Sequence, residues 1–361
     1  MKIVCVGYLH GAGGAERQIV MLANNLAKMG HNVTLIILAC ANIKYEISSD
    51  VKILDLTVAE QAKGNKIFNR FKALKKAYLD ISPDVTIHYW LQSAYLTAFM
   101  NGNVRGKIIY SERGDPGDKE YKGLLAFVRL VAFKKMDGFV FQSIGARDYF
   151  KKDVKNKSII IPNSVHIPLV KYDVPCKNRV KRIVNVGRLD EQKNQKLLIE
   201  AFALIANEIP DYTLEIFGEG TLKDSLEKLV CDRNLQGRVI FRETTKNIFE
   251  EVYKSSLFVL SSDFEGMPNA LMEAMALGVP CISTDCRPGG ARELITDGYN
   301  GYIVDCGSVC NLAKTIKKVL GDDNLSVVFA NNAMEIRKTH SDQEVFLKWA
   351  QYIEKVVKTD D

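Results

Sequence analysis

Two glutamates eight residues apart, Glu265 and Glu273, are the side chains of this chain that most clearly suggest chemistry. Pro268, between them, favours the first turn of a helix, and Gly266 lets a ligand approach the backbone closely. The free N–H groups at the start of such a helix, at about Met267–Leu271, favour an anion such as a phosphate. We therefore expect the two carboxylates to bracket one anionic ligand.

The surrounding elements support this interpretation. On spacing alone, two such glutamates are more often solvated acids at the exposed edge of a helix. The apolar run Leu257–Leu260 predicts a buried strand, Asn269–Leu277 predicts a helix that Gly278 ends, and Val279–Thr284 predicts a second strand. The loop between strand and helix thus lies at the carboxyl end of a strand, where open α/β sheets bind ligands.

The whole run from Glu265 to Pro280 resembles the E-x7-E signature of family 4 glycosyltransferases, which are sugar-nucleotide-dependent enzymes with two facing Rossmann-like domains. The resemblance implies that Glu273 bonds the nucleotide ribose. It also implies that Glu265, with the backbone after Gly266, meets the donor sugar and phosphate. The donor-binding residues implied in this segment are Glu265, Gly266, Met267, Pro268, Asn269, Ala270 and Glu273.

A second segment supplies two cations. Arg188 and Lys193 follow a predicted strand, Ile183–Gly187, and precede a predicted helix, so they also lie at the carboxyl end of a strand. Both can offset the charge that develops on a leaving nucleoside diphosphate. The run Gly-Arg-Leu-x-x-x-Lys-Asn resembles the diphosphate-binding segment of the family, so we predict Glu265, Arg188 and Lys193 as catalytic residues, with both cations contacting the donor.

The chain opens on a similar unit, with a Gly-rich loop, His10–Glu16, before a predicted helix, Glu16–Met29. A dinucleotide fingerprint is not expected, because Glu16 replaces its third glycine and no acid follows the next strand. Gly-Gly-Ala-Glu-Arg instead resembles the amino-terminal loop of the family. That resemblance implies donor contacts for Gly13 and Gly14, and a plain tight turn is the alternative.

Strands alternating with helical patterns predict an α/β protein with doubly wound parallel sheets. The further strands are expected at 51–56, 84–89, 107–111, 138–142, 158–162, 212–217 and 239–241. With the family resemblance, this predicts the two-domain GT-B architecture. The predicted parts are an acceptor-binding Rossmann-like domain at 1–165, a linker at 166–181, a nucleotide-sugar-binding Rossmann-like domain at 182–340, and a terminal helix at 341–361 that crosses back to the first domain.

A charged turn, Ser111–Pro116, follows one of these strands. Its Ser-Glu-Arg-x-Asp-Pro run resembles a subset of bacterial polysaccharide-building members of the family, although many members have a histidine near this place. Glu112 and Arg113 are therefore candidates for sugar or acceptor contacts. A structural turn between Arg113 and Asp115 is the alternative.

Composition limits the remaining possibilities. The chain has 361 residues, 47% hydrophobic and 25% charged, which suits two cores. It has no apolar run of about 20 residues and no signal-peptide pattern, so a cytoplasmic location is expected. Eight cysteines without a C-x-x-C pair predict reduced thiols. The chain also lacks Asp-x-Asp, the motif through which another glycosyltransferase fold holds a divalent ion on the donor diphosphate, so a donor site without a metal is expected.

Positive charge is concentrated in the amino-terminal half, with 24 Lys and Arg against 14 Asp and Glu up to Val165. Such a surface could meet nucleic acid, anionic lipid or a phosphorylated acceptor. The predicted helix Gly64–Asp80 has apolar residues at helical spacing and several lysines. It is either a core-facing helix with a solvated basic side or a peripheral contact with an anionic membrane.

The family resemblance, taken with these observations, implies a retaining glycosyltransferase that moves a hexose from a nucleoside diphosphate sugar, expected to be a UDP-sugar, without cofactor or metal. The expected acceptor is a glycan or polyprenyl-linked glycan of a bacterial surface polysaccharide such as a capsule, and no nucleic acid partner is expected. The alternatives are a UDP-sugar epimerase of the same two-domain shape and a non-catalytic two-lobed protein that binds a small anion.

Overall fold

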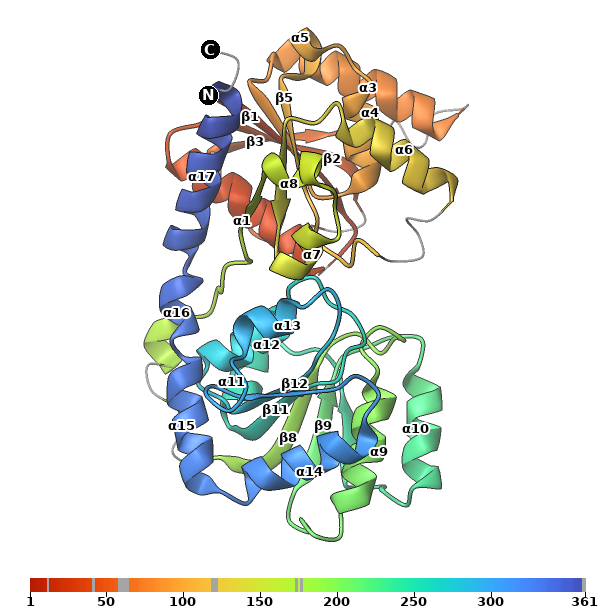
Figure 1. Cartoon of the computed structure of the whole chain (residues 1–361), viewed down its shortest axis with the longest axis vertical. Coiled ribbons are helices and arrows are strands. Elements are labelled where there is room, and N and C mark those ends of the chain that lie inside the picture. The colour runs from red at the N-terminus through yellow and green to blue at the C-terminus, as the bar shows by residue number, and fades with distance from the viewer. Residues whose placement is uncertain are drawn as a thin grey trace. The chain divides into compact units, whose positions relative to one another are not determined.

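The computed structural model of the chain describes residues 1–11, 13–40, 43–57, 65–117, 123–172, 175 and 178–358. It divides the chain into two compact units (Figure 1). Unit 1 is Met1–Ser164 with Gln343–Asp361, and unit 2 is Val165–Asp342.

Unit 1 is built on a parallel seven-stranded sheet in the order β3-β2-β1-β4-β5-β6-β7. Its strands are β1 (Lys2–Leu9), β2 (Asn32–Cys40), β3 (Val51–Asp55), β4 (Val85–His88), β5 (Lys107–Ser111), β6 (Gly138–Phe141) and β7 (Ser158–Ile160). Its helices are α1 (Gly14–Lys28), α3 (Lys66–Ile81), α4 (Leu91–Ala98), α5 (Gly102–Arg105), α6 (Leu124–Phe133), α7 (Ile144–Asp148), α8 (Lys152–Asn156) and α17 (Asp342–Lys358).

The continuous apolar sequence of β1 is explained by burial on both faces of the sheet. Alternate side chains of a strand point to opposite faces. Ile3 therefore packs in a cluster with residues of α1 and α17, whereas Val4 packs in a second cluster with Leu74 and Tyr78 of α3.

Helix α17 belongs to unit 1 by its packing, although it follows unit 2 in the chain (Figure 1). Phe346, Trp349 and Ile353 are buried in the cluster of β1 and α1. The hydroxyl of Tyr352 accepts a hydrogen bond from the backbone N–H of Phe139 at 2.9 Å. The prediction that the terminal helix returns to the first domain is confirmed, and residues 359–361 lie outside the described residues.

Unit 2 has a parallel six-stranded sheet in the order β10-β9-β8-β11-β12-β13. Its strands are β8 (Val180–Val186), β9 (Thr213–Phe217), β10 (Val239–Arg242), β11 (Ser255–Leu260), β12 (Cys281–Thr284) and β13 (Tyr302–Val304). Its helices are α9 (Gln195–Ile205), α10 (Lys223–Asp232), α11 (Ile248–Tyr253), α12 (Asn269–Ala276), α13 (Gly290–Leu294), α14 (Val309–Leu320), α15 (Asp323–Ala333) and α16 (Ile336–Thr339), with a 3-10 turn at Leu169–Tyr172. The predicted two-sheet α/β architecture is confirmed.

Each sheet has a point where its strand order reverses. In unit 1 the order runs outward in both directions from β1 and β4, and in unit 2 from β8 and β11. Loops at the carboxyl ends of such a strand pair leave the sheet in opposite directions and create a ligand crevice. These two places are therefore where the sheets position a site.

The boundaries of two predicted segments need correction. The strand β8 begins at Val180, inside the predicted linker 166–181. The apolar pattern missed this start because Arg182 is charged, and its burial against Glu215 and Glu251 depends on tertiary contacts. The predicted linker is also partly core, since Tyr172 is buried in unit 2. Residues 173, 174, 176 and 177 lie outside the described residues.

The predicted helix Gly64–Asp80 starts two residues later, at Lys66. The side chain of Asn65 caps it by accepting the N–H of Ile67 at 2.9 Å. Gly64 lies outside the described residues.

Candidate active site

The loops after β8 and β11, at the reversal point of the unit 2 sheet, are joined by several hydrogen bonds. Asp263 donates its N–H to the carbonyl of Gln192 at 2.9 Å. Asn194 donates its side-chain amide to Asp263 Oδ1 at 2.8 Å, and Ser261 Oγ donates to the carbonyl of Lys193 at 2.9 Å. These bonds hold two segments about 70 residues apart in sequence as one structure.

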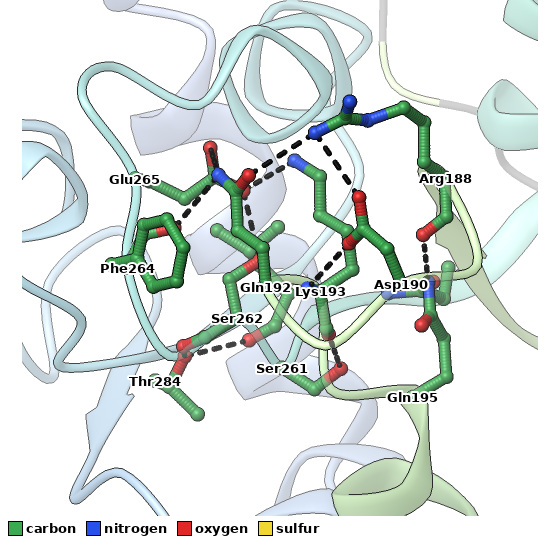
Figure 2. Close-up of polar contacts among 12 residues, drawn as sticks. Arg188, Asp190, Gln192, Lys193, Gln195, Ser261, Ser262, Phe264, Glu265 and Thr284 are labelled. Atoms are coloured by element: carbon green, nitrogen blue, oxygen red, sulfur yellow. Dashed lines mark hydrogen bonds and ion pairs between the residues drawn. The ribbon is translucent and has the colours of Figure 1, made fainter. Parts of the chain in front are cut away.

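Glu265 is the buried centre of this arrangement, with 6% of its surface exposed (Figure 2). Its Oε1 accepts hydrogen bonds from Lys193 Nζ and, at 2.8 Å, from Ser262 Oγ. Its Oε2 accepts a longer bond, 3.4 Å, from Gln192 Nε2. Because the side chains of Lys193 and Glu265 are only 18% and 8% exposed, the ion pair is fixed in orientation and shielded from solvent.

Arg188 lies beside this pair but is 71% exposed (Figure 2). Its Nη2 contacts Asp190 Oδ2 at 3.1 Å and donates to Gln192 Oε1 at 3.2 Å. Gln192 also donates to the carbonyl of Phe264 at 3.0 Å. The amide of Gln192 thus connects the exposed guanidinium to the buried carboxylate, and an anion from solvent can reach the guanidinium.

Helix α12 begins immediately after this site, at Asn269, with Pro268 as its first flanking residue. Its start is pressed against α13: a Cβ added to Gly290 would lie 2.0 Å from the carbonyl oxygen of Gly266. Gly266, Met267 and Pro268 are buried, and Asn269 and Ala270 are partly exposed. The predicted helix, with Gly278 at φ 65° after its end, is observed as Asn269–Ala276.

Glu273 lies in the second turn of α12 and is partly exposed. Its neighbours Met272 and Ala274 are buried in the core of unit 2. The structure therefore places Glu265 in the loop and Glu273 within the helix, as the pattern predicted.

The predicted donor glycines, Gly13 and Gly14, lie in unit 1 at the start of α1, and both are exposed. Glu16 folds back over their loop: its two carboxylate oxygens accept the backbone N–H groups of His10 at 3.1 Å and Gly11 at 3.0 Å. Two backbone amides of the Gly-rich loop are therefore engaged by a carboxylate. Ala12 lies outside the described residues.

Glu112, also in unit 1, is only 3% exposed. Its Oε1 accepts the N–H groups of Arg113 at 3.0 Å and Gly114 at 3.1 Å, and its Oε2 accepts the hydroxyl of Tyr110 at 3.0 Å. Burial raises the pKa of Glu112 above its ordinary value, and these three bonds act against that shift. The described contacts of Glu112 are those of a structural turn.

Arg113 faces the returning helix α17. Its guanidinium lies 3.8 Å from the ring centroid of Tyr89 and 5.8 Å from that of Trp349, and Nη1 donates to Asn163 Oδ1 at 2.8 Å. A sugar or acceptor contact by Arg113 stays a prediction.

Comparison with known proteins decides the family. A model of group 1 glycosyl transferases matches residues 173–336, and a model of glycosyltransferase family 4 matches residues 12–167. The chain is also 30% identical over 287 residues to an uncharacterized glycosyltransferase of Methanocaldococcus jannaschii, covering 72% of this chain and 70% of that protein. The chain belongs to the family 4 glycosyltransferases.

The similarity of this glycosyltransferase to other proteins extends over its whole length. It is 28% identical over 364 residues, 99% of both chains, to the Campylobacter jejuni GalNAc-alpha-(1->4)-GalNAc-alpha-(1->3)-diNAcBac-PP-undecaprenol alpha-1,4-N-acetyl-D-galactosaminyltransferase. Among solved structures it is similar to Anabaena HepE in complex with UDP, with a TM-score of 0.80 at 19% identity over 98% of this chain and 100% of HepE. The GT-B fold is thereby confirmed.

Gln192 belongs to this hydrogen-bonded arrangement, and the sequence pattern assigned it no role. The available signal was its position in the loop between the two predicted cations, Arg188 and Lys193. A side-chain amide both donates and accepts hydrogen bonds, so it can connect a guanidinium to a carboxylate. Which carboxylate it would meet depended on the order of strands in the sheet.

In the part of the chain that the structure describes, no three His, Cys, Asp or Glu side chains come together as a candidate metal site. The free thiols are Cys5, Cys231, Cys281, Cys286, Cys306 and Cys310. The metal independence of the glycosyltransferase stays a prediction.

Proposed function

We propose that this glycosyltransferase moves a hexose from a UDP-sugar to a hydroxyl of a glycan or lipid-linked glycan, with retention of anomeric configuration. The observation that carries the proposal is the buried Lys193–Glu265 pair beside the exposed Arg188, at the reversal point of the unit 2 sheet. This arrangement offers a fixed acceptor for sugar hydroxyls next to positive charge for a diphosphate.

Glu265 is suited to hold the donor sugar. An ionised carboxylate has about four acceptor positions, and three of those on Glu265 are used by Lys193, Ser262 and Gln192. The remaining capacity lies on Oε2, whose described bond is the longest of the three. A sugar hydroxyl that donates there would be oriented by a carboxylate that cannot turn away.

The same contacts also support our proposal that configuration is retained. A carboxylate that forms a buried ion pair and accepts several hydrogen bonds is a poor nucleophile, because its lone pairs are already engaged. We therefore assign Glu265 to positioning and expect the acceptor hydroxyl to attack from the face that the diphosphate leaves. The departing phosphate would then take the proton of the acceptor hydroxyl.

Arg188 and the first N–H groups of α12 supply the charge stabilisation that this reaction requires. Negative charge grows on the diphosphate as the bond to the sugar breaks. An exposed guanidinium with several donors can bind it in a forked geometry, while Lys193, whose charge is offset by Glu265, holds that carboxylate in place. Glu273, further along α12, is our candidate for the ribose hydroxyls.

A glycan acceptor at a membrane is supported by the curated relatives. Besides the undecaprenol-linked Campylobacter enzyme, they include a lipopolysaccharide core biosynthesis glycosyltransferase of Rhizobium meliloti, 28% identical over 330 residues. The basic excess of the amino-terminal half would favour a phosphorylated acceptor and peripheral contact with the cytoplasmic face of an anionic membrane. No helix in the described part of the chain is long and apolar enough to cross a membrane.

A screen of UDP- and GDP-sugars for thermal stabilisation and for acceptor-free hydrolysis tests the donor. Product analysis with a lipid-linked glycan then tests the reaction. We expect release of UDP together with an extended acceptor that keeps the anomeric configuration of the donor. Free UDP with an altered sugar and no extended acceptor would indicate an epimerase, and an inverted linkage would overturn retention.

Metal independence has its own test. Activity should survive EDTA, because the positive charge proposed for the donor site comes from a cationic side chain and from the partial charges of backbone N–H groups. Loss of activity that manganese restores would show that a metal holds the diphosphate.

A further inference from the structure

Helix α6 of unit 1 buries its charged side chain and exposes apolar ones, which is the reverse of an ordinary surface helix. Its sequence, Leu-Leu-Ala-Phe-Val-Arg-Leu-Val-Ala-Phe, contains one charged residue, Arg129. Arg129 is only 7% exposed, and its Nη1 donates to the carbonyl of Pro116 at 3.0 Å. Phe127 and Leu130, in contrast, are 64% and 56% exposed. A helix on the surface of a soluble domain normally turns its charges outward, so the outward face of α6 has the composition of a contact surface.

Helix α3 adds to this surface. Both α3 and α6 pack against α4, and Figure 1 shows the three helices together on one side of the unit 1 sheet. Ile67 and Phe68, in the first turn of α3, are 64% and 54% exposed. We call Ile67, Phe68, Phe127 and Leu130 the α3/α6 surface.

The α3/α6 surface is flanked by positive charge. Lys72, Lys75 and Lys76 are exposed on α3, and Lys134 and Lys135 are exposed directly after α6. Lys72 Nζ lies 4.5 Å from the ring centroid of Phe68. The only acid of the two helices is Asp80, near the end of α3.

The topology relates the α3/α6 surface to the substrate edge of the sheet. Helix α3 follows β3 and α6 follows β5, so both helices begin on the side where the parallel strands end. In open parallel sheets this is the edge at which ligands bind. The exposed first turn of α3 and the start of α6 therefore lie toward this edge of the unit 1 sheet.

We propose that the α3/α6 surface docks the enzyme on an anionic lipid surface, with the apolar side chains in the headgroup region and the lysines on lipid phosphates. Exposed aromatic and aliphatic residues flanked by lysines have the chemistry of a membrane-surface helix. A second copy of the chain fits less well, because two lysine-rich faces would repel each other. The inference rests on the proposed function in one respect: it places a lipid-linked acceptor beside the acceptor edge of the sheet.

Co-sedimentation of the full chain with vesicles tests the proposal. We expect binding to phosphatidylcholine vesicles with about 30% phosphatidylglycerol at low salt, and binding at least about tenfold weaker to phosphatidylcholine alone. Binding should also be lost at about 0.5 M salt, where the screening length falls to a few ångström. Equal binding to the two kinds of vesicle would overturn the assignment to an anionic surface.

Phe127→Ser with Leu130→Ser should weaken binding to the anionic vesicles about tenfold or more, because burial of two large apolar side chains is lost. The matched control is Val327→Ser with Val328→Ser, which removes two valines of unit 2 that are 58% and 49% exposed on α15. The control should bind vesicles as the wild type does. Unchanged binding by the α6 variant would overturn the proposal.

Two further measurements separate this proposal from others. Calorimetry with UDP should give the same affinity for the α6 variant as for the wild type, so vesicle binding can fail while the donor function stands. The molecular mass in solution should not depend on the α6 substitutions. A wild-type dimer that these substitutions dissociate, without vesicle binding by either form, would assign the surface to a second copy and overturn the lipid proposal.

Discussion

The strand order reverses at one point in each of the two sheets, but the glutamates at these two points have different kinds of partner. After β1 in unit 1, Glu16 accepts N–H groups of His10 and Gly11 in its own loop. After β8 and β11 in unit 2, Glu265 pairs with Lys193 from a different loop. A carboxylate bonded within its own loop closes that loop, whereas one bonded between loops joins two elements of the sheet edge. A glutamate near a strand end thus acquires its role from the partner that the sheet brings to it.

The two regions can be monitored separately. Both tryptophans, Trp90 and Trp349, belong to unit 1. Tryptophan fluorescence therefore reports on the unfolding of unit 1, whereas circular dichroism reports on both units.

The largest effect is expected from Lys193→Met, which leaves the buried carboxylate of Glu265 without its cation. Removing one partner of a buried ion pair costs about 3 to 5 kcal/mol, and the bonds from Ser262 and Gln192 favour the lower end here. The transition seen by circular dichroism should move to lower temperature, while the tryptophan transition stays. Adding Glu265→Leu should restore much of the stability and none of the activity. No recovery in the double variant would contradict the ion-pair interpretation.

Glu265→Gln keeps the shape of the side chain but removes its charge. We expect turnover to fall about 10² to 10³-fold, as for other groups that act in the transition state. The affinity for UDP should remain close to that of the wild type, because the lost contact is to the sugar. Steady-state kinetics with calorimetry on the same preparation would check both numbers, and a large loss of UDP affinity would move Glu265 to the nucleotide.

Glu273→Gln should do the reverse and weaken UDP itself. A charged acceptor to hydroxyls contributes about 1.5 to 3 kcal/mol, which corresponds to about a 10 to 150-fold change in dissociation constant. Calorimetry with UDP on this variant and on Glu265→Gln gives the comparison directly. Equal UDP affinity in the two variants would show that the assignment of roles is wrong.

Glu16→Gln tests the other side of the comparison, the loop that closes on itself. The amide keeps one acceptor oxygen, so one of the two bonds to the loop N–H groups remains. We expect a loss of about 1 kcal/mol. It should appear in the tryptophan transition of unit 1, and a shift confined to circular dichroism would contradict this placement.

The smallest effect should come from Glu112→Gln and should depend on pH. Burial raises the pKa of Glu112, so the folded state holds this proton to a higher pH than the unfolded state does. The contribution of Glu112 to stability is therefore complete below its ordinary pKa of about 4.5 and is lost as pH rises through the raised value. Glutamine does not titrate, so the melting temperature of the variant should rise relative to that of the wild type as pH increases above 4.5. A constant difference would show that Glu112 does not titrate in this range.

Most strands could be predicted from the sequence, because strands buried on both faces are continuous apolar runs. The start of β8 could not, since Arg182 interrupts the run and its burial depends on tertiary partners, Glu215 at 3.3 Å, Glu251 at 2.8 Å and Ser255 Oγ at 2.9 Å. The outward apolar face of α6 could not be predicted from the sequence either. An apolar helix predicts burial, and only the packing shows which of its sides is left exposed.

The sequence by itself determined that Arg188, Lys193 and Glu265 would each follow a strand of a parallel sheet, because that depends on local apolar runs and turn residues. Only the tertiary structure decided that Lys193 meets Glu265 and that Gln192 connects it to Arg188. The physical reason is that β8 and β11 are neighbours in the sheet, although Gly187, directly after β8, and Ser255, the first residue of β11, are 68 positions apart in the sequence. Strand order is set by the packing of the whole unit, and no local pattern encodes it.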